Sequence, residues 1–77
     1  MPRDGGPGVT PTIAVLSCRE EAVLDLLASG CGEREIAGRM RLTVFTIRAH
    51  KANARRKLGA STTYQAMAIY IAARGRE

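Results

Sequence analysis

The sequence predicts an all-α fold, a four-helix bundle within one small domain. Apolar residues recur every three to four positions along most of the chain, which is the spacing of one helix face. Capping residues and glycines stand where the resulting segments would begin and end. No segment shows the strict alternation that is typical of a half-buried strand. Because the chain has only 77 residues, it forms at most one domain with a small core.

The composition predicts a cytoplasmic domain with a polyanionic partner. Twelve lysines and arginines against seven acids give a net charge of +5. Two cysteines are too few for a disulfide-stabilised miniprotein, and one histidine leaves too few ligands for a metal site. No apolar run approaches the ~20 residues that cross a bilayer, and the first residues lack the apolar segment of a signal peptide. We therefore expect no metal, no cofactor, no small-molecule ligand and no membrane association.

The chain is expected to begin with a flexible arm and then enter its first helix. Residues 1–15 are rich in proline and glycine and lack apolar periodicity, so we assign them to the arm and residues 16–77 to the folded domain. The first helix spans about 17–29, opened by a capping box of Ser17 and Glu20. Its apolar stripe consists of Val23, Leu24, Leu26 and Leu27, and Gly30 stops the helix.

Two further helices follow, joined by a tight turn at Arg41-Leu42. The second spans about 33–40 and turns Ile36, Ala37 and Met40 toward the core. The third spans about 43–58, with Thr43 as its cap and Gly59 at its end. Its buried side consists of Val44, Ile47, Ala54 and Leu58. Helical spacing gathers a second, exposed row, made up of Phe45, Arg48, Ala49, Ala52 and either Arg55 or Arg56.

The fourth helix is more apolar than one small core can cover. Thr62 and Gln65 form a second capping box that opens a helix to about Arg74. Residues 66–73 carry no charge, and a helix that is apolar all round is buried all round. One side holds Ala66, Met67 and Tyr70, and the other holds Ala68, Ile69 and Ala72. We expect one set to pack inward and the other to form a dimer interface, the alternative being a monomer with an apolar patch.

The net charge is concentrated in the second and third helices. Residues 16–33 sum to −3, residues 34–57 sum to +7, and from Arg39 to Lys57 there are seven bases and no acid. A solvated face usually mixes both signs, so this segment favours a polyanion site. Two short helices joined by a tight turn, the second longer and basic, form a helix-turn-helix. In that motif the outward row contacts base edges while flanking bases hold phosphates.

Several segments match a known family. They are Leu16-Ser17-Cys18-Arg19-Glu20, Val23-Leu24, Leu26-Leu27-Ala28-Ser29-Gly30, Glu35-Ile36-Ala37, Leu42-Thr43, Thr46-Ile47-Arg48-Ala49-His50, Asn53 and Lys57-Leu58-Gly59. Through them the chain, from Leu16 to about Ile71, resembles the four-helix DNA-binding domain of the LuxR/NarL/GerE transcription regulators. The resemblance implies a bacterial regulator whose third helix enters the major groove of double-stranded DNA, often as a homodimer through the fourth helix. If the 77 residues are the whole protein, it resembles the stand-alone GerE type without a built-in sensor.

The resemblance also assigns roles to particular residues. It implies base contacts for Arg48, Ala49 and Ala52, to which we add Phe45. It implies phosphate contacts for Thr46 and Lys57, and we expect the same of Thr43, Lys51, Arg55 and Arg56. The Phe45 ring could contact a thymine methyl group or pack into the core. His50 matches a frequent family histidine, for which we favour a structural role over a chemical one.

The chain departs from the family pattern where the second helix opens, and other classes of function stay open. Gly32-Glu33 replaces the usual capping residue and asparagine, so the cap of this helix is weaker. A promoter-reading region of a sigma factor shares part of the pattern. The fold could also serve as a protein-binding module, for instance on RNA polymerase. The sequence argues against an enzyme, because it holds no nucleophile with an acid–base partner and no phosphate-binding glycine loop.

Overall fold

The computed structural model describes residues 15–75, and within that range it contains four helices and no strand. The helices are α1 (Cys18–Ala28), α2 (Glu33–Met40), α3 (Val44–Lys57) and α4 (Thr63–Gly75). The expected all-α fold is confirmed, and every helix end lies within one residue of its predicted position. Apart from Val15, the arm expected at residues 1–15 lies outside the described residues.

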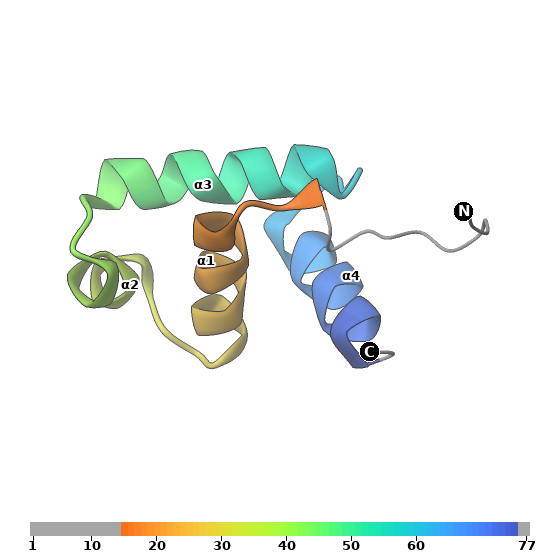
Figure 1. The fold of residues 1–77 in the computed structure, drawn as a ribbon, viewed down its shortest axis with the longest axis horizontal. Coiled ribbons are helices and arrows are strands. Elements are labelled where there is room, and N and C mark those ends of the chain that lie inside the picture. The colour runs from red at the N-terminus through yellow and green to blue at the C-terminus, as the bar shows by residue number, and fades with distance from the viewer. Residues whose placement is uncertain (1–14, 76–77) are drawn as a thin grey trace.

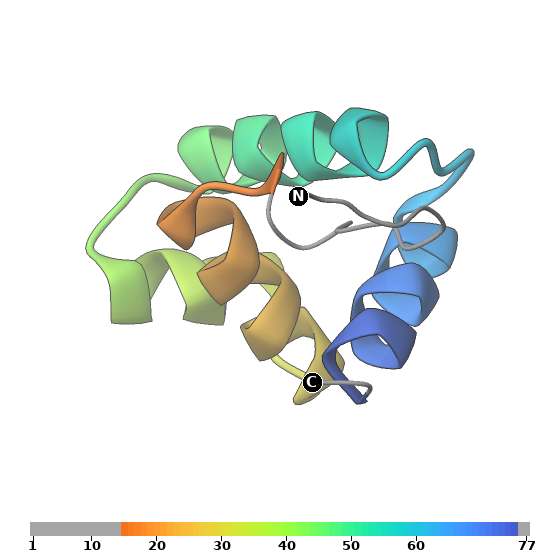
Figure 2. The ribbon, with the colours of Figure 1, turned by 45° about the vertical axis from the view of Figure 1, so that its right-hand side comes forward.

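The longest helix, α3, runs along one edge of the molecule. Figure 1 shows α1, α2 and α4 on the same side of α3, and the rotated view of Figure 2 shows the same arrangement. All three of these helices contact α3. One long side of α3 is therefore supported by the other three helices, while none of residues 15–75 outside α3 covers the opposite side.

The core consists of two clusters that meet at α1. One cluster joins α1, α3 and α4 and contains Leu16, Leu24, Ala54 and Tyr70. The other joins α1, α2 and α3 and contains Val23, Ile36, Ala37 and Ile47. The neighbouring residues Val23 and Leu24 are both fully buried, one in each cluster. Since α1 contributes to both clusters, it fixes α3 against α2 on one flank and against α4 on the other.

Both predicted capping boxes can be followed in the hydrogen bonds, and one differs from expectation. At α1, the Ser17 hydroxyl accepts from the Glu20 N–H at 3.1 Å, and the Glu20 carboxylate accepts from the Ser17 N–H at 2.9 Å. At α4, the Thr62 hydroxyl accepts from the Gln65 N–H at 3.0 Å. The Gln65 amide oxygen, however, accepts from the Ser61 N–H at 2.7 Å. This cap therefore extends one residue further back than the capping box pattern predicts.

Three helices end at a residue in the left-handed region, and one of these residues is not glycine. Gly30 and Gly59 have φ of 96° and 70°, whereas Arg41 has φ of 58°. At each end a 6→1 backbone bond closes the turn, as in the 2.9 Å bond from the Leu42 N–H to the Ala37 carbonyl. The predicted turn at Arg41-Leu42 is thus the same C-terminal motif, adopted by an arginine at a conformational cost.

Replacing Arg41 should separate this backbone cost from the loss of a charge. We expect Arg41→Gly to be more stable than Arg41→Ala by about 1 kcal/mol, because glycine adopts the left-handed region without a Cβ penalty. Both variants lose the same guanidinium, so their comparison cancels its contribution. Urea unfolding followed by circular dichroism measures the difference. Equal free energies of unfolding would show that the turn at Arg41 is not strained.

Candidate nucleic-acid interface

The uncovered side of α3 carries the row of residues that the sequence predicts to contact bases. The Phe45 side chain is 81% exposed, which excludes the core position that the sequence left open. Arg48 and Ala49 are also exposed, and Ala52 is half-buried. The row lies opposite the buried Ile47 and Ala54, so the rotation of α3 follows the predicted periodicity.

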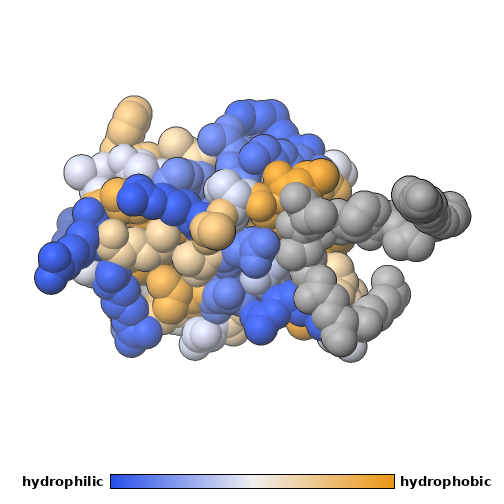
Figure 3. Space-filling view, viewed as in Figure 1, coloured by the Kyte–Doolittle hydropathy of each residue, from blue (hydrophilic) through white to orange (hydrophobic). Residues whose placement is uncertain are grey.

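The row continues with Arg56 rather than Arg55. Arg56 is exposed and donates to the Asn53 side chain within α3. Arg55 is half-buried, and its Nη1 donates to the Ala60 carbonyl at 3.1 Å, which closes the C-terminal end of the helix. No acid occurs in α3, and its last turn holds Arg55, Arg56 and Lys57. Figure 3 shows hydrophilic side chains gathered over this end of α3.

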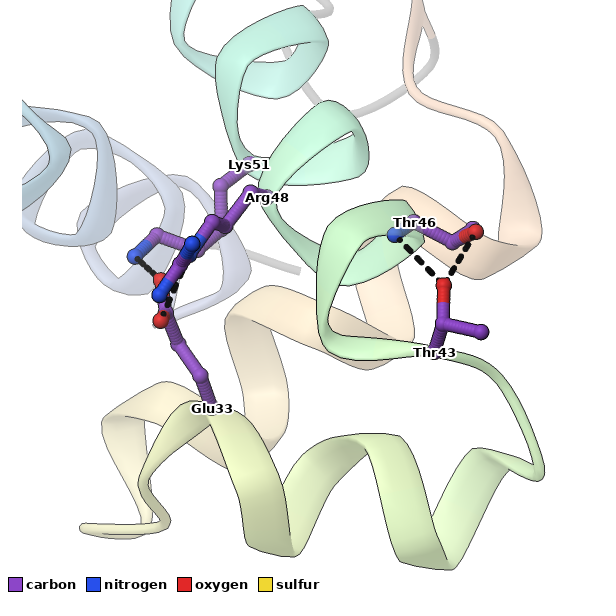
Figure 4. A network of polar contacts seen from close by, with 5 residues as sticks. All are labelled: Glu33, Thr43, Thr46, Arg48 and Lys51. Atoms are coloured by element: carbon purple, nitrogen blue, oxygen red, sulfur yellow. Dashed lines mark hydrogen bonds and ion pairs between the residues drawn. The ribbon is translucent and has the colours of Figure 1, made fainter.

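Two threonine hydroxyl groups stand at the N-terminus of α3. The Thr43 Oγ1 accepts from the Thr46 N–H at 3.0 Å and donates to the Thr46 Oγ1 at 3.0 Å (Figure 4). Thr43 is exposed and Thr46 is half-buried. The positive end of the helix dipole lies at the same place, which favours an anion there.

Glu33, the first residue of α2, holds two of the predicted contact residues. Its Oε1 accepts from Arg48 Nε at 3.0 Å, and its Oε2 lies 2.8 Å from Lys51 Nζ (Figure 4). The hydrogen bonds from Lys51 and Arg48 lower the pKa of the Glu33 carboxyl below its usual 4.5. The cap of α2 is weak, as predicted, because Gly32 at the N-cap position has no side chain to accept a hydrogen bond. No local pattern in the sequence indicates the contact with α3, since Glu33 is 15 and 18 residues away from its partners.

Lys57 makes a second ion pair, with Glu20 of the α1 capping box. The two charged groups lie 2.9 Å apart, and Glu20 is only 4% exposed. Burial by itself would raise the pKa of Glu20. The hydrogen bonds from Ser17 and Lys57, together with the Lys57 charge, outweigh burial and lower that pKa below 4.5. Glu20 therefore caps α1 and also fastens it to the end of α3.

The outward face of α4 is apolar and uncharged. Ala68 and Ala72 are exposed, and the third residue predicted for this face, Ile69, is half-buried. Tyr64 and Ile71, which were not predicted for this face, are 82% and 51% exposed. Their spacing of four, three and one residues with Ala68 and Ala72 is that of one helix face, so the same helical periodicity could have found them.

The inner side of α4 is tied to α1 by a polar cluster. The buried Tyr70 hydroxyl donates to Asp25 at 2.9 Å, and Arg74 also pairs with Asp25. The Arg74 guanidinium stands 5.7 Å from the centre of the Tyr70 ring, within cation–π range. Burial, together with Asp25, raises the pKa of Tyr70 to about 12. Since Ala66 and Met67 lie on this side as well, the set of Ala66, Met67 and Tyr70 is the one of the two that packs inward.

Within residues 15–75, no three histidine, cysteine, aspartate or glutamate side chains are grouped so that they could hold a metal ion. In that same stretch, none of the helices combines the length and hydrophobicity needed to cross a membrane. His50 is half-buried, and its Nε2 is buried without a hydrogen-bond partner among the described residues.

Together, α2, the turn at Arg41 and α3 form a helix-turn-helix whose second helix presents an uncovered basic side. The family described as "Bacterial regulatory proteins, luxR family" matches residues 14–70, and the chain belongs to that family. This confirms the resemblance stated from the sequence.

Two kinds of relative illustrate the match. The chain is 46% identical over 48 residues to the Fimbriae Z protein of Escherichia coli strain K12, covering 62% of this chain and 23% of that protein. It is 42% identical over 50 residues to the oxygen regulatory protein NreC of Staphylococcus aureus strain JH9, covering 65% of this chain and 23% of that protein. The chain thus matches about a quarter of the length of these curated relatives. No solved structure gives a significant match.

Proposed function

We propose that this chain is a sequence-specific DNA-binding domain of a transcriptional regulator, with α3 in the major groove of double-stranded DNA. The observation that carries the proposal is the uncovered side of α3, which presents Arg48 and Arg56 and holds no acidic residue. An α-helix with side chains is ~10–12 Å wide, and the major groove is ~12 Å wide. The names of the relatives, a regulatory protein among them, agree with a regulatory role.

The contacts divide by position along α3. Arg48 lies in the middle of the exposed row, where a guanidinium can donate two hydrogen bonds to a guanine edge. The Phe45 ring and the methyl groups of Ala49 and Ala52 offer no hydrogen bond, so they suit thymine methyl groups. With Arg48 as the one hydrogen-bonding side chain among these four residues, part of the specificity is expected to come from DNA shape.

Phosphates are expected at both ends of α3. At the N-terminal end, a phosphate of one DNA strand is expected to bind the Thr43 and Thr46 hydroxyl groups and the positive end of the helix dipole. At the C-terminal end, the other strand is expected to meet three basic side chains, those of Arg55, Arg56 and Lys57. Because α3 is supported by three helices along its inner side, these two ends are held at a fixed separation.

The test of this proposal is the salt dependence of binding to duplex DNA. With about four phosphate contacts, we expect affinity to fall about a hundredfold or more between 50 and 200 mM salt. Fluorescence anisotropy titrations on one labelled duplex measure it. Absence of binding at low salt would overturn the proposal and would favour the protein-binding alternative.

We further propose that the domain acts as a homodimer through the outward face of α4. Tyr64, Ala68, Ile71 and Ala72 form an uncharged surface there, and two-fold dimers of this motif read half-sites about one helical turn apart. Analytical ultracentrifugation should show a concentration-dependent dimer that Ala68→Glu abolishes. Ala28→Glu, at an exposed position of α1, is the control. A monomer at all concentrations, with and without DNA, would contradict the dimer and would leave this face for another partner such as RNA polymerase.

A further inference from the structure

The contact between Glu33 and α3 is the most tightly organised polar cluster on the DNA-facing side of the described structure. Both carboxylate oxygens are engaged, one by Arg48 Nε and the other by Lys51 Nζ. Figure 4 shows the two basic side chains converging from α3 on this one acid at the start of α2. The two bases differ in accessibility, because the Arg48 side chain is 65% exposed and that of Lys51 only 21%.

We propose that Glu33 is a positioning residue that orients Arg48 for base reading and withholds Lys51 from the phosphates. This inference rests on the proposed function and deepens it. Among the seven basic residues from Arg39 to Lys57, it distinguishes the one that recognises the DNA sequence from one that does not contact DNA.

The orientation of Arg48 follows from which of its nitrogens is engaged. Glu33 takes Nε, and no acceptor among residues 15–75 contacts the two Nη groups. Those two nitrogens form the end of the planar fork that donates two parallel hydrogen bonds. A side chain already held in one geometry loses less conformational entropy when it binds. Glu33 therefore favours the reading of a guanine edge by the end of the Arg48 guanidinium.

Lys51 behaves differently, although the sequence places it among the phosphate contacts. Its ammonium is paired at 2.8 Å and its side chain is mostly covered. To reach a phosphate it would have to leave Oε2 of the half-buried Glu33 without its partner beside the negative DNA backbone, which costs free energy although Arg48 still engages Oε1. Lys51 therefore neutralises Glu33 and supports it, and it adds little to non-specific attraction.

The acid itself contributes to discrimination. A carboxylate beside the reading face opposes any DNA that does not offer Arg48 a good acceptor, which is specificity through an unfavourable contact. Removing Glu33 should therefore strengthen binding to random DNA while weakening the preference for the best site.

The experiment compares Glu33→Ala with Glu35→Ala. Both variants remove one acid from the first turn of α2, but Glu35 is exposed and pairs only with Arg39 of the same helix. We expect Glu33→Ala to lower the ratio of best-site to random-DNA affinity about tenfold. It should also steepen the salt slope on random DNA by about one, as Lys51 is released. Glu35→Ala should raise both affinities by a similar factor and leave their ratio unchanged.

The outcomes separate this inference from the proposed function. A wild-type chain that binds no DNA at low salt overturns the proposed function. A wild-type chain that binds, with an equal ratio in the two variants, overturns the role of Glu33. If Glu33→Ala fails to fold, nitrogen-15 NMR of the free wild-type protein decides: the Arg48 Nε–H should exchange with water several-fold more slowly than that of exposed Arg34. Equal exchange rates would overturn the inference.

Discussion

Replacing Arg48 with alanine is expected to weaken binding to the best DNA site by about 1–3 kcal/mol, a loss of about 5- to 150-fold. Random DNA should lose much less, so the variant becomes less selective rather than simply weaker. The reason is that Arg48 is the one side chain in the exposed row of α3 that is both central and able to donate paired hydrogen bonds. Its neighbours in the row offer methyl groups and one aromatic ring.

Arg56→Ala is the matched control for this prediction. Arg56 carries the same guanidinium on the same helix and is also exposed, but it lies near the C-terminal end, where phosphate contact is expected. It should weaken all sequences alike and reduce the salt slope by about one. Selection of bound sequences from random DNA identifies the best site, and anisotropy titrations then measure both variants. If Arg48→Ala also weakens every sequence equally, Arg48 is a phosphate contact.

The local signals in the sequence were sufficient to predict the four helices. The Ser17 capping box, the stops at Gly30 and Gly59 and the apolar spacing all act within a few residues, and each is found in the structure. At Gln65 the side chain accepts a hydrogen bond from the Ser61 N–H, one residue before the Thr62 N–H that the capping box predicts. Such signals depend on neighbours along the chain and not on tertiary contacts.

The ion pairs could not be predicted in the same way. Lys57 meets Glu20 across 37 residues, and Lys51 meets Glu33 across 18. A run of like charges in the sequence shows how many basic residues are present. It does not show which of them lie next to an acidic residue of another helix. In the free domain, these two lysines are engaged by acids of α1 and α2, and whether they contact phosphates stays a prediction.

These pairs give the charge asymmetry of the sequence a structural meaning. The acids of the −3 segment that meet α3 approach it from the supporting helices, at Glu20 and Glu33. The arginines of the outward row, Arg48 and Arg56, are exposed. Acid pairing thus stabilises the packing of α3 on the inside, while positive charge is retained where DNA is proposed to bind.

The largest effect on stability is expected at Leu24, where α1 supports α3 and α4 together. Leu24 is fully buried in the cluster with Ala54 and Tyr70, so Leu24→Ala should cost about 2–5 kcal/mol through lost burial and a residual cavity. A domain of this size has a total stability of roughly 3–9 kcal/mol. The variant should therefore unfold about 8 °C or more below wild type, at about 4–8 °C per kcal/mol.

The effect of Leu24→Ala on DNA binding distinguishes a residue that stabilises the domain from one that contacts DNA. Leu24 lies on the far side of α3 from the exposed row, so Leu24→Ala should bind DNA normally at low temperature and lose binding only as the domain unfolds. Ile71→Ala removes an apolar side chain that is 51% exposed. At protein concentrations too low for dimers, it should change the free energy of unfolding by no more than about 0.5 kcal/mol. Thermal melts followed by circular dichroism, paired with anisotropy at each temperature, measure both. A loss below about 1 kcal/mol for Leu24→Ala would mean that the cluster with Ala54 and Tyr70 does not depend on Leu24.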